Sequence, residues 1–303
     1  MKVLVTGGHG FVGKSVCEEL KKRSVEFDAP THKEADLTDP RVVEDLIKGY
    51  AKVIHCAGLV GGILANKTRP AEFFYQNALQ CINTLHYSYK SGTVDKYVGL
   101  AAGCGYPKHL ESPFNEDKFW DGYPDENSYA YSLAKKNIVV QANAYKEQYG
   151  FDSTILLPAN LYGPHDNFDL KSSHVVPALI RKFVEAVESG HTEVVIWGSG
   201  KSSREFIYVE NTAKAIVDAA YNKAGVGPYN LGTGVETTIT ELVDLLKRLT
   251  GFKGDIVWDA SKPDGQPRRY YDMSKFKEEF GYTPDTSLEE GLKKTIEWYR
   301  NNG

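Results

Sequence analysis

The first half of the chain alternates short apolar runs with longer amphipathic segments. Buried strands are predicted over Lys2–Thr6, Val25–Pro30, Lys52–Ala57, Lys96–Ala101 and Ser153–Leu157. Helices are predicted between and beside them, over Phe11–Arg23, Val42–Lys48, Ala71–Lys90 and Tyr129–Tyr149. Such alternation predicts a parallel sheet with helices on both of its faces.

After Pro158 the pattern changes, with longer loops, fewer strands and helices predicted over Val175–Glu188, Thr240–Leu249 and Leu288–Asn301. We therefore expect an α/β fold, a Rossmann-type doubly wound parallel sheet with a smaller mixed α/β substrate-binding lobe. The Rossmann domain is assigned residues 1–160 and about 205–232, and the second lobe about 161–204 and 233–303. Ligands of such sheets lie beyond the carboxyl ends of the strands, so we expect the site between the lobes.

A glycine-rich turn joins the first strand to the first helix, and Gly7, Gly10 and Gly13 stand there in G-x-x-G-x-x-G spacing. Glycines at such a turn let the backbone approach a pyrophosphate, which the helix N-terminus then faces. We expect Phe11 and Val12, at the start of that helix, to join the glycines in binding a dinucleotide.

The segment after the second strand bears on which dinucleotide is bound. An acidic residue at the end of that strand would favour NAD, whereas this chain has His32 and Lys33, which could hold a 2′-phosphate. Asp28 falls within the strand. We expect NADP(H), with plain solvent-facing charges as the alternative role of His32 and Lys33. Asp36 and Leu37, placed after a further short strand, are expected to contact the adenine.

Tyr131 and Lys135 form a Y-x-x-x-K pair at the start of a predicted helix. Residues four apart share one helix face, and an ammonium beside a phenol favours the phenolate. We therefore expect the pKa of Tyr131 to be lowered toward neutrality, so that the phenol can act as an acid or a base.

Composition narrows the class of protein. The 303 residues are 41% hydrophobic and 25% charged with a formal net charge of -4, and no dense Lys/Arg run indicates a nucleic-acid partner. No apolar run approaches the ~18 residues of a membrane helix. The four cysteines show neither C-x-x-C nor zinc spacing, so we expect no metal, free thiols and a cytoplasmic protein.

Further motifs run nearly end to end: Val60–Ile63, Pro70–Phe73 with Gln76-Asn77, Cys104–Lys108, Pro158–Phe168, Ser173–Leu179, Trp197–Gly200, Arg204–Phe206 and Leu288–Leu292. Together with the glycine turn and Y-x-x-x-K, they resemble an extended short-chain dehydrogenase/reductase. The loop at Val60, the cysteine and the segment around His174 resemble the GDP-L-fucose synthase family in particular.

The resemblance implies a two-part reaction. GDP-4-keto-6-deoxy-mannose is epimerised at C3 and C5 and then reduced at C4 by NADPH, giving GDP-L-fucose. Carried over by motif, Cys104 is the base and His174 the acid of the epimerisation. Tyr131 stabilises the enolate and protonates O4, Lys135 tunes Tyr131 and binds ribose, and Arg204 contacts the diphosphate.

The remaining expected site residues follow from the same motifs. Those assigned to the cofactor are Ala57, Pro158, Asn160 and Leu161. Those assigned to the GDP-sugar are Val60, Gly61, Asn160, His174, Val175, Lys182, Trp197 and Arg269. The resemblance also implies a homodimer, joined through the helices over 71–90 and 129–149.

One position departs from the family pattern. The family usually has Ser or Thr four residues before the tyrosine of Tyr-Pro-Lys, where its hydroxyl bonds the reacting C4 oxygen. Here that position is Ala102. Loss of one oxyanion donor costs on the order of 10²–10³ in rate, so we expect a substitute, such as a bound water or a backbone N–H near Gly103.

Three other functions remain open. The first is a stand-alone C4 reductase of another GDP-4-keto-6-deoxy sugar or a heptose, in which Cys104 and His174 are not catalytic. The second is an NAD-dependent sugar-nucleotide 4-epimerase. The third is a weakly active nucleotide-binding protein, in which the missing hydroxyl at Ala102 is a sign of the weak activity.

Overall fold

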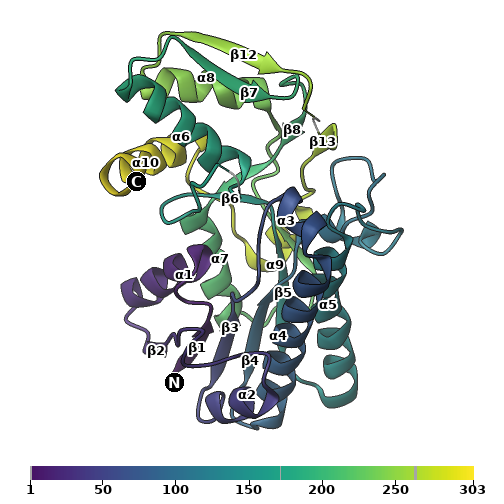
Figure 1. Ribbon diagram of the computed structural model, residues 1–303. Coiled ribbons are helices and arrows are strands. Elements are labelled where there is room, and N and C mark those ends of the chain that lie inside the picture. The colour runs from purple at the N-terminus through teal and green to yellow at the C-terminus, as the bar shows by residue number, and fades with distance from the viewer. Residues whose placement is uncertain (1, 171, 263–264) are drawn as a thin grey trace.

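A parallel sheet of six strands forms the centre of the lower lobe in the computed structural model, which describes residues 2–170, 172–262 and 265–303 (Figure 1). Its strand order is β10 (Tyr229–Leu231), β5 (Ser153–Pro158), β4 (Lys96–Leu100), β3 (Lys52–His55), β1 (Val3–Thr6) and β2 (Phe27–Asp28). The chain adds β2 on one side of β1 and then β3, β4 and β5 in turn on the other side. The direction in which strands are added therefore reverses between β1 and β3. The expected doubly wound fold is confirmed, and this reversal point is where such sheets bind ligands.

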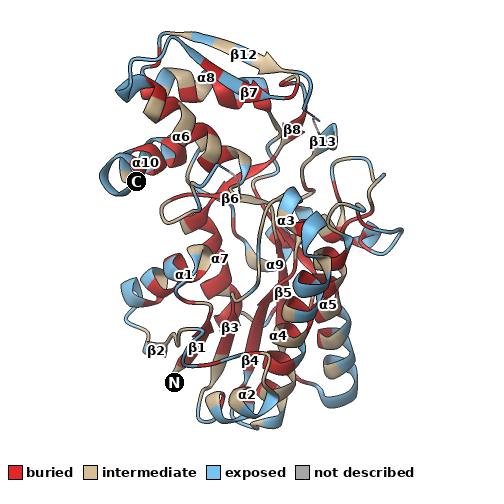
Figure 2. Cartoon of the chain, viewed as in Figure 1, coloured by how far each residue is buried: buried red, intermediate tan, exposed pale blue. Residues whose placement is uncertain are grey.

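Helices cover both faces of this sheet. On one side α1 (Phe11–Lys22) packs against α7 (Val209–Tyr221). On the other α4 (Pro70–Lys90) packs along α5 (Tyr129–Tyr149), with α2 (Pro40–Leu46) beside α4 (Figure 1). Every residue of β1 and β4 is buried, as the red strands of Figure 2 show. Strands buried on both faces read as continuous apolar runs, which is why these were predictable.

The upper lobe is built from α6 (Val175–Glu188), α8 (Ile239–Thr250) and α10 (Leu288–Asn302), with the parallel pair β7 (Glu193–Trp197) and β12 (Asp255–Asp259) above them. Capping boxes at Thr238 and Ser287 begin α8 and α10, because each hydroxyl accepts from the backbone N–H three residues later. Apolar faces of the three helices enclose a second core, separate from that of the sheet.

Short strands connect the lobes. β6 (Asn160–Tyr162) pairs with β9 (Phe206–Tyr208), and β8 (Ser203–Arg204) lies between β11 (Thr237–Thr238) and β13 (Arg268–Arg269). The helices α3 (Ile63–Thr68) and α9 (Ser274–Phe280) lie below them, beside the carboxyl ends of the large sheet (Figure 1). These connections bring residues from distant parts of the chain over that edge of the sheet.

Several elements differ from expectation. β2 has only two residues, and residues 29–39 form turns and bends instead of the short strand expected before Asp36. Helix α7 was not expected, and the second half carries more strands than its hydropathy indicates. No helix among the described residues is long and apolar enough to cross a membrane.

The lobe boundaries stay a prediction, and the two cores suggest a refinement of them. Tyr271, Met273 and Phe276 belong to the core of the sheet, although the sequence places them in the second lobe. We propose that the segment around α9 returns to the Rossmann domain. Its return brings residues 268–271 over the edge of the sheet.

Candidate active site

The glycine turn after β1 has the geometry that a dinucleotide requires. Gly7 has a left-handed φ of 72°, and a Cβ built on Gly13 would lie 2.0 Å from the Gly7 carbonyl oxygen. Gly10 is the N-cap of α1, where no side chain caps the helix and no acidic residue stands in the first turn. An uncapped N-terminus behind an exposed glycine suits a pyrophosphate, so the turn fits the expected cofactor.

Asp28 is the last residue of β2, so the expectation that it falls within the strand is wrong, and its side chain is 43% exposed. The Asp28 carboxylate pairs with Lys2 Nζ at 2.8 Å and accepts a hydrogen bond from the Tyr50 hydroxyl. Both contacts fall on Oδ2, and they lower the pKa of Asp28. His32 and Lys33 are both exposed beyond the strand. This edge thus carries the acidic residue that favours NAD together with exposed cations that suit a 2′-phosphate.

Lys135 is buried beneath the Y-x-x-x-K helix face. Its Nζ lies 3.9 Å from Cys81 Sγ, and Cys81 Sγ lies 3.8 Å from His55 Nε2. The other ring nitrogen of His55 bonds Thr6 Oγ1 at 2.7 Å. Burial and the Lys135 charge hold the pKa of His55 well below its ordinary value. These buried contacts hold the Lys135 ammonium beside the end of β3.

The expected lowering of the Tyr131 pKa is wrong for this structure. Burial raises the pKa of Tyr131, and the charge on Cys104 raises it further. The Lys135 ammonium is directed at Cys81, so it does not outweigh this desolvation. Tyr131 is therefore a neutral phenol at physiological pH, which suits an acid that gives a proton to a carbonyl oxygen.

Cys104 stands in a 3-10 turn, Gly103–Gly105, directly beyond β4. Its charge also raises the pKa of Tyr271, as expected of a group that lies near both Tyr131 and Tyr271. A Cβ built on Gly103 would lie 1.8 Å from Tyr271 Oη and 2.9 Å from Arg269 Nη2. Thus Arg269, expected at the substrate, does reach the cysteine segment.

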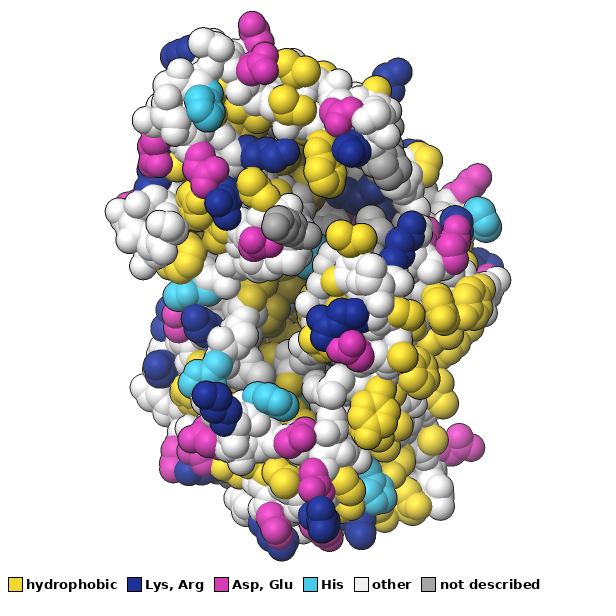
Figure 3. Space-filling view, viewed as in Figure 1, with side chains coloured by type: hydrophobic (Ala, Val, Ile, Leu, Met, Phe, Trp, Pro, Cys, Tyr) yellow, Lys and Arg dark blue, Asp and Glu magenta, His cyan; other side chains and the backbone are white. Residues whose placement is uncertain are grey.

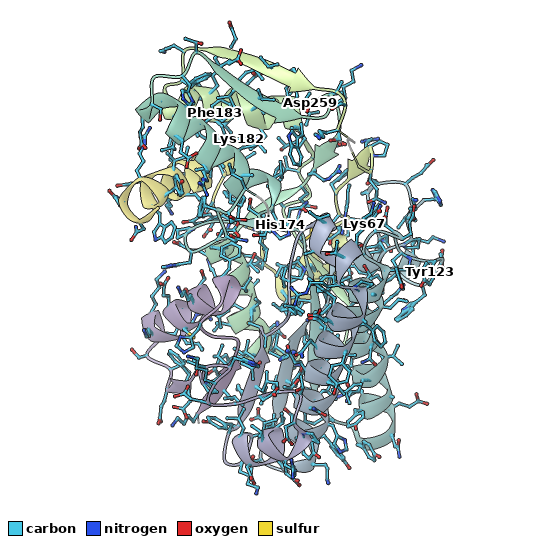
Figure 4. All side chains as sticks on the ribbon, viewed as in Figure 1. Lys67, Tyr123, His174, Lys182, Phe183 and Asp259 are labelled. Atoms are coloured by element: carbon cyan, nitrogen blue, oxygen red, sulfur yellow. The ribbon has the colours of Figure 1, made fainter. Side chains whose placement is uncertain are left out.

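His174 is the N-cap of α6, and Figure 4 places it between the two lobes. Figure 3 shows that the face drawn there is hollowed between the lobes. The loop that carries Val60 and Gly62 lies close to the His174 segment, since a Cβ on Gly62 would lie 3.6 Å from the Ser172 carbonyl oxygen. Surrounding protein lowers the pKa of His174 by desolvation, although the side chain is solvent accessible. Val60 is exposed in the same loop, as expected of a residue that meets a ligand.

Basic and aromatic groups expected at the nucleotide gather in the upper lobe. Trp197 is 63% exposed, and the ammonium groups of Lys182 and Lys262 lie 5.7 and 5.4 Å from the centre of its ring. Arg204 and Arg269 are register partners on β8 and β13. The Arg204 guanidinium donates to two backbone carbonyls, each at 2.7 Å. Cations beside an exposed indole suit a nucleoside diphosphate.

Asn160 connects the two lobes beneath this cluster. Its side chain donates to the backbone carbonyl of Glu205 at 2.8 Å. The buried Glu205 carboxylate in turn accepts from the backbone N–H of Tyr271 at 2.8 Å and of Gly234 at 2.6 Å. Burial raises the pKa of Glu205 despite these bonds. Tyr271 was missed from sequence, although it lies two residues beyond Arg269, where extended residues share a face.

Comparison with known proteins agrees with this geometry. Residues 3–232 match the model of the NAD dependent epimerase/dehydratase family. The chain is 40% identical over 304 residues to a probable GDP-L-fucose synthase of Oryza sativa, covering 99% of this chain and 92% of the relative.

Two solved structures share the fold over the whole chain. A GDP-6-OMe-4-keto-L-xylo-heptose reductase from C. jejuni superposes with a TM-score of 0.92 at 28% identity, covering 100% of this chain and 98% of that one. A GDP-L-fucose synthetase from Naegleria fowleri bound to NADP gives a TM-score of 0.89 at 30% identity, covering 99% and 94%.

The sheet, glycine turn and Y-x-x-x-K helix thus define a nicotinamide-dependent enzyme of the short-chain dehydrogenase type. The chain belongs to the NAD dependent epimerase/dehydratase family. The resemblance to GDP-L-fucose synthase that its motifs indicate is confirmed. No group of three or more His, Cys, Asp or Glu in the described parts of the chain is placed to hold a metal ion.

Proposed function

We propose that this protein converts a GDP-4-keto-6-deoxy-mannose-type substrate to GDP-L-fucose by epimerisation at C3 and C5 and reduction at C4. The observation that carries the proposal is the position of Cys104 on the turn beyond β4, where its charge acts on Tyr131 and where a Cβ on the adjoining Gly103 would lie 2.9 Å from Arg269 Nη2. Full-length similarity to GDP-L-fucose synthases supports the same conclusion.

The two epimerised carbons flank the C4 ketone, which acidifies their protons. Cys104 accepts a proton from each carbon, and His174 returns one on the opposite face. The neutral Tyr131 phenol hydrogen-bonds the enolate oxygen. Reduced nicotinamide, when bound, supplies hydride to C4, and Tyr131 gives its proton to O4. Lys135 binds ribose and keeps the site electropositive.

We propose NADP(H) as the cofactor. Gly7, Gly10, Phe11, Val12 and Gly13 would hold its pyrophosphate. His32 and Lys33 would meet the 2′-phosphate, because Asp28 is already paired. The adenine and nicotinamide contacts are assigned to Asp36, Leu37, Ala57, Lys135, Pro158, Asn160 and Leu161.

The substrate would span the hollow between the lobes. We propose that Trp197, Lys182 and Arg204 bind the GDP moiety in the upper lobe. The sugar would lie lower, against Val60, Gly61, Asn160, His174, Val175 and Arg269.

We also propose a homodimer formed through α4 and α5. Apolar side chains stay exposed on these helices at helical spacing, including Tyr75 and Ile82 on α4 and Tyr129 and Val140 on α5. Figure 3 shows apolar side chains gathered over this face. A partner's equivalent helices would cover them.

The test is a steady-state assay of NADPH consumption with GDP-4-keto-6-deoxy-mannose. We expect consumption only when the sugar nucleotide is present, with NADH a poorer donor. Tyr131→Phe should lower kcat by about 10²–10⁴-fold, which is the rate factor that a positioned general acid usually contributes. Wild-type enzyme that consumes no NADPH would contradict the proposal.

A stand-alone C4 reductase is the second candidate, favoured by the close match of fold to the heptose reductase. In that case NADPH is consumed, but protons at C3 and C5 never exchange with solvent. The two functions are thus separable by isotope incorporation.

A further inference from the structure

Tyr271 brings a hydroxyl to Gly103, the residue that follows Ala102 beyond the end of β4. Ala102 offers only a methyl group where the family usually has a hydroxyl. Its neighbour Gly103 has no side chain, and a Cβ there would lie 1.8 Å from Tyr271 Oη. The Tyr271 hydroxyl therefore occupies the space that a side chain at position 103 would fill.

The ring of Tyr271 is held firmly in this place. It is 3% exposed and stacks obliquely on Tyr106 and Phe114, with ring centres 6.0 and 6.5 Å apart. Its backbone N–H donates to the buried Glu205 carboxylate at 2.8 Å. Because ring and backbone are both fixed, the hydroxyl arrives at the sheet edge preorganised.

The Tyr271 hydroxyl is also available as a hydrogen-bond donor. Its one hydrogen bond to a described carbonyl, that of Pro158, is 3.3 Å long, well beyond the usual ~2.8 Å for O–H···O, and is therefore weak. Burial raises the pKa of Tyr271, and the neighbouring Arg269 guanidinium only partly offsets this. The phenol thus stays protonated and can exchange the Pro158 contact for a better acceptor.

Resting on the proposed function, we propose that the Tyr271 hydroxyl donates the hydrogen bond to the substrate C4 oxygen that the residue at position 102 cannot give. Sequence alone suggested a water or a backbone N–H for this role, and the structure offers a side chain instead. Tyr131 still transfers the proton to O4. Tyr271 keeps its own proton and stabilises the charge on that oxygen in the enolate and during reduction.

Arg269 has a positioning part in this arrangement. Its Nη2 lies 2.9 Å from the same point above Gly103 that Tyr271 Oη approaches. A guanidinium beside the phenol oxygen polarises the hydroxyl and strengthens it as a donor. Tyr271 and Arg269 come from one extended segment and reach the site together.

The inference is tested by a double-mutant cycle between Tyr271→Phe and Ala102→Ser, with kcat and KM measured under NADPH saturation. Tyr271→Phe should lower kcat about 10²–10³-fold and leave KM within about three-fold. Ala102→Ser should recover at least about ten-fold of this loss, yet change the wild-type enzyme little. Tyr270→Phe, a neighbouring tyrosine outside the proposed site, is the matched control and should keep wild-type kcat.

Three results would overturn the inference. Tyr271→Phe could keep wild-type kcat, Ala102→Ser could act equally in both backgrounds, or the loss could fall on KM and thermal stability, as a purely structural role predicts. If the wild-type enzyme is active and any of these results is found, only the role of Tyr271 is refuted and the proposed function stands. A wild-type enzyme that does not turn over the sugar nucleotide removes the proposed function and this inference with it.

Discussion

Gly103→Ala probes the placement of the Tyr271 hydroxyl without any substrate. The φ of Gly103 lies outside the left-handed region, so the backbone accepts alanine and only neighbouring atoms oppose it. The new Cβ would lie 1.8 Å from Tyr271 Oη, so the hydroxyl must retreat by about 1.2 Å to reach even 3.0 Å. Overpacking of a fixed buried site costs about 1–3 kcal/mol of unfolding free energy.

Tyr271→Phe removes Oη, the atom that lies closest to the new Cβ. The closest remaining atoms are then the ring carbon that carried the hydroxyl, at 3.0 Å, and Arg269 Nη2, at 2.9 Å on a flexible side chain. We therefore expect Gly103→Ala to cost at least about 1 kcal/mol less in the Tyr271→Phe background than in the wild type.

Guanidinium chloride unfolding of the wild type, both single variants and the double variant gives this coupling directly. A matched substitution, Gly122→Ala, meets Pro107 at 3.1 Å and should show no coupling to Tyr271. Equal costs of Gly103→Ala in both backgrounds, or no cost in either, would refute the placement of the hydroxyl.

Three further predictions concern other buried or reactive groups. Asn230→Ala should lower the unfolding free energy by about 2–4 kcal/mol, because it removes the hydrogen bonds of Asn230 with the buried Tyr106 hydroxyl and the Asp272 carbonyl, while the Phe114 carbonyl keeps the Asp272 N–H; a loss under about 1 kcal/mol on denaturation would speak against this. Burial raises the pKa of Asp166 to about 7, and its Oδ2 has no hydrogen bond to any residue that the structure describes, so the folded state favours the protonated acid and stability falls as pH rises from about 4 to 7. Asp166→Asn should therefore exceed the wild type in stability at pH 8, by at most about 4 kcal/mol, and the gap should close toward pH 4 in a denaturation series; a pH-independent gap would exclude this origin. His174→Asn should reduce deuterium incorporation from D₂O about 10²–10⁴-fold while NADPH affinity is kept, and unchanged incorporation would remove His174 from the catalytic set.

The lower lobe was largely predictable because its strands are buried on both faces. Continuous apolar runs such as Lys96–Leu100 and Ser153–Pro158 carry that burial in the sequence itself. The glycine turn and the family motifs supply the candidate site residues, whose roles stay a prediction. The upper lobe was less predictable, because strands of two or three residues, such as Ser203–Arg204, are too short to show a periodicity.

Two features of the site depend on the tertiary structure. The pKa of Tyr131 was expected to fall because Lys135 is four residues away, but desolvation raises it and the ammonium lies by Cys81. Tyr271 reaches Gly103 across 168 positions of sequence, which no local pattern indicates. Burial and long-range contact therefore decided the points on which sequence reasoning was wrong or silent.

Incubation with GDP-4-keto-6-deoxy-mannose and NADPH in D₂O, followed by NMR of the product, tests the central claim most directly. We predict GDP-L-fucose that carries deuterium at both C3 and C5. A reduced GDP-6-deoxy sugar without deuterium at those carbons would contradict the epimerisation and leave a C4 reductase in which Cys104 and His174 are not catalytic.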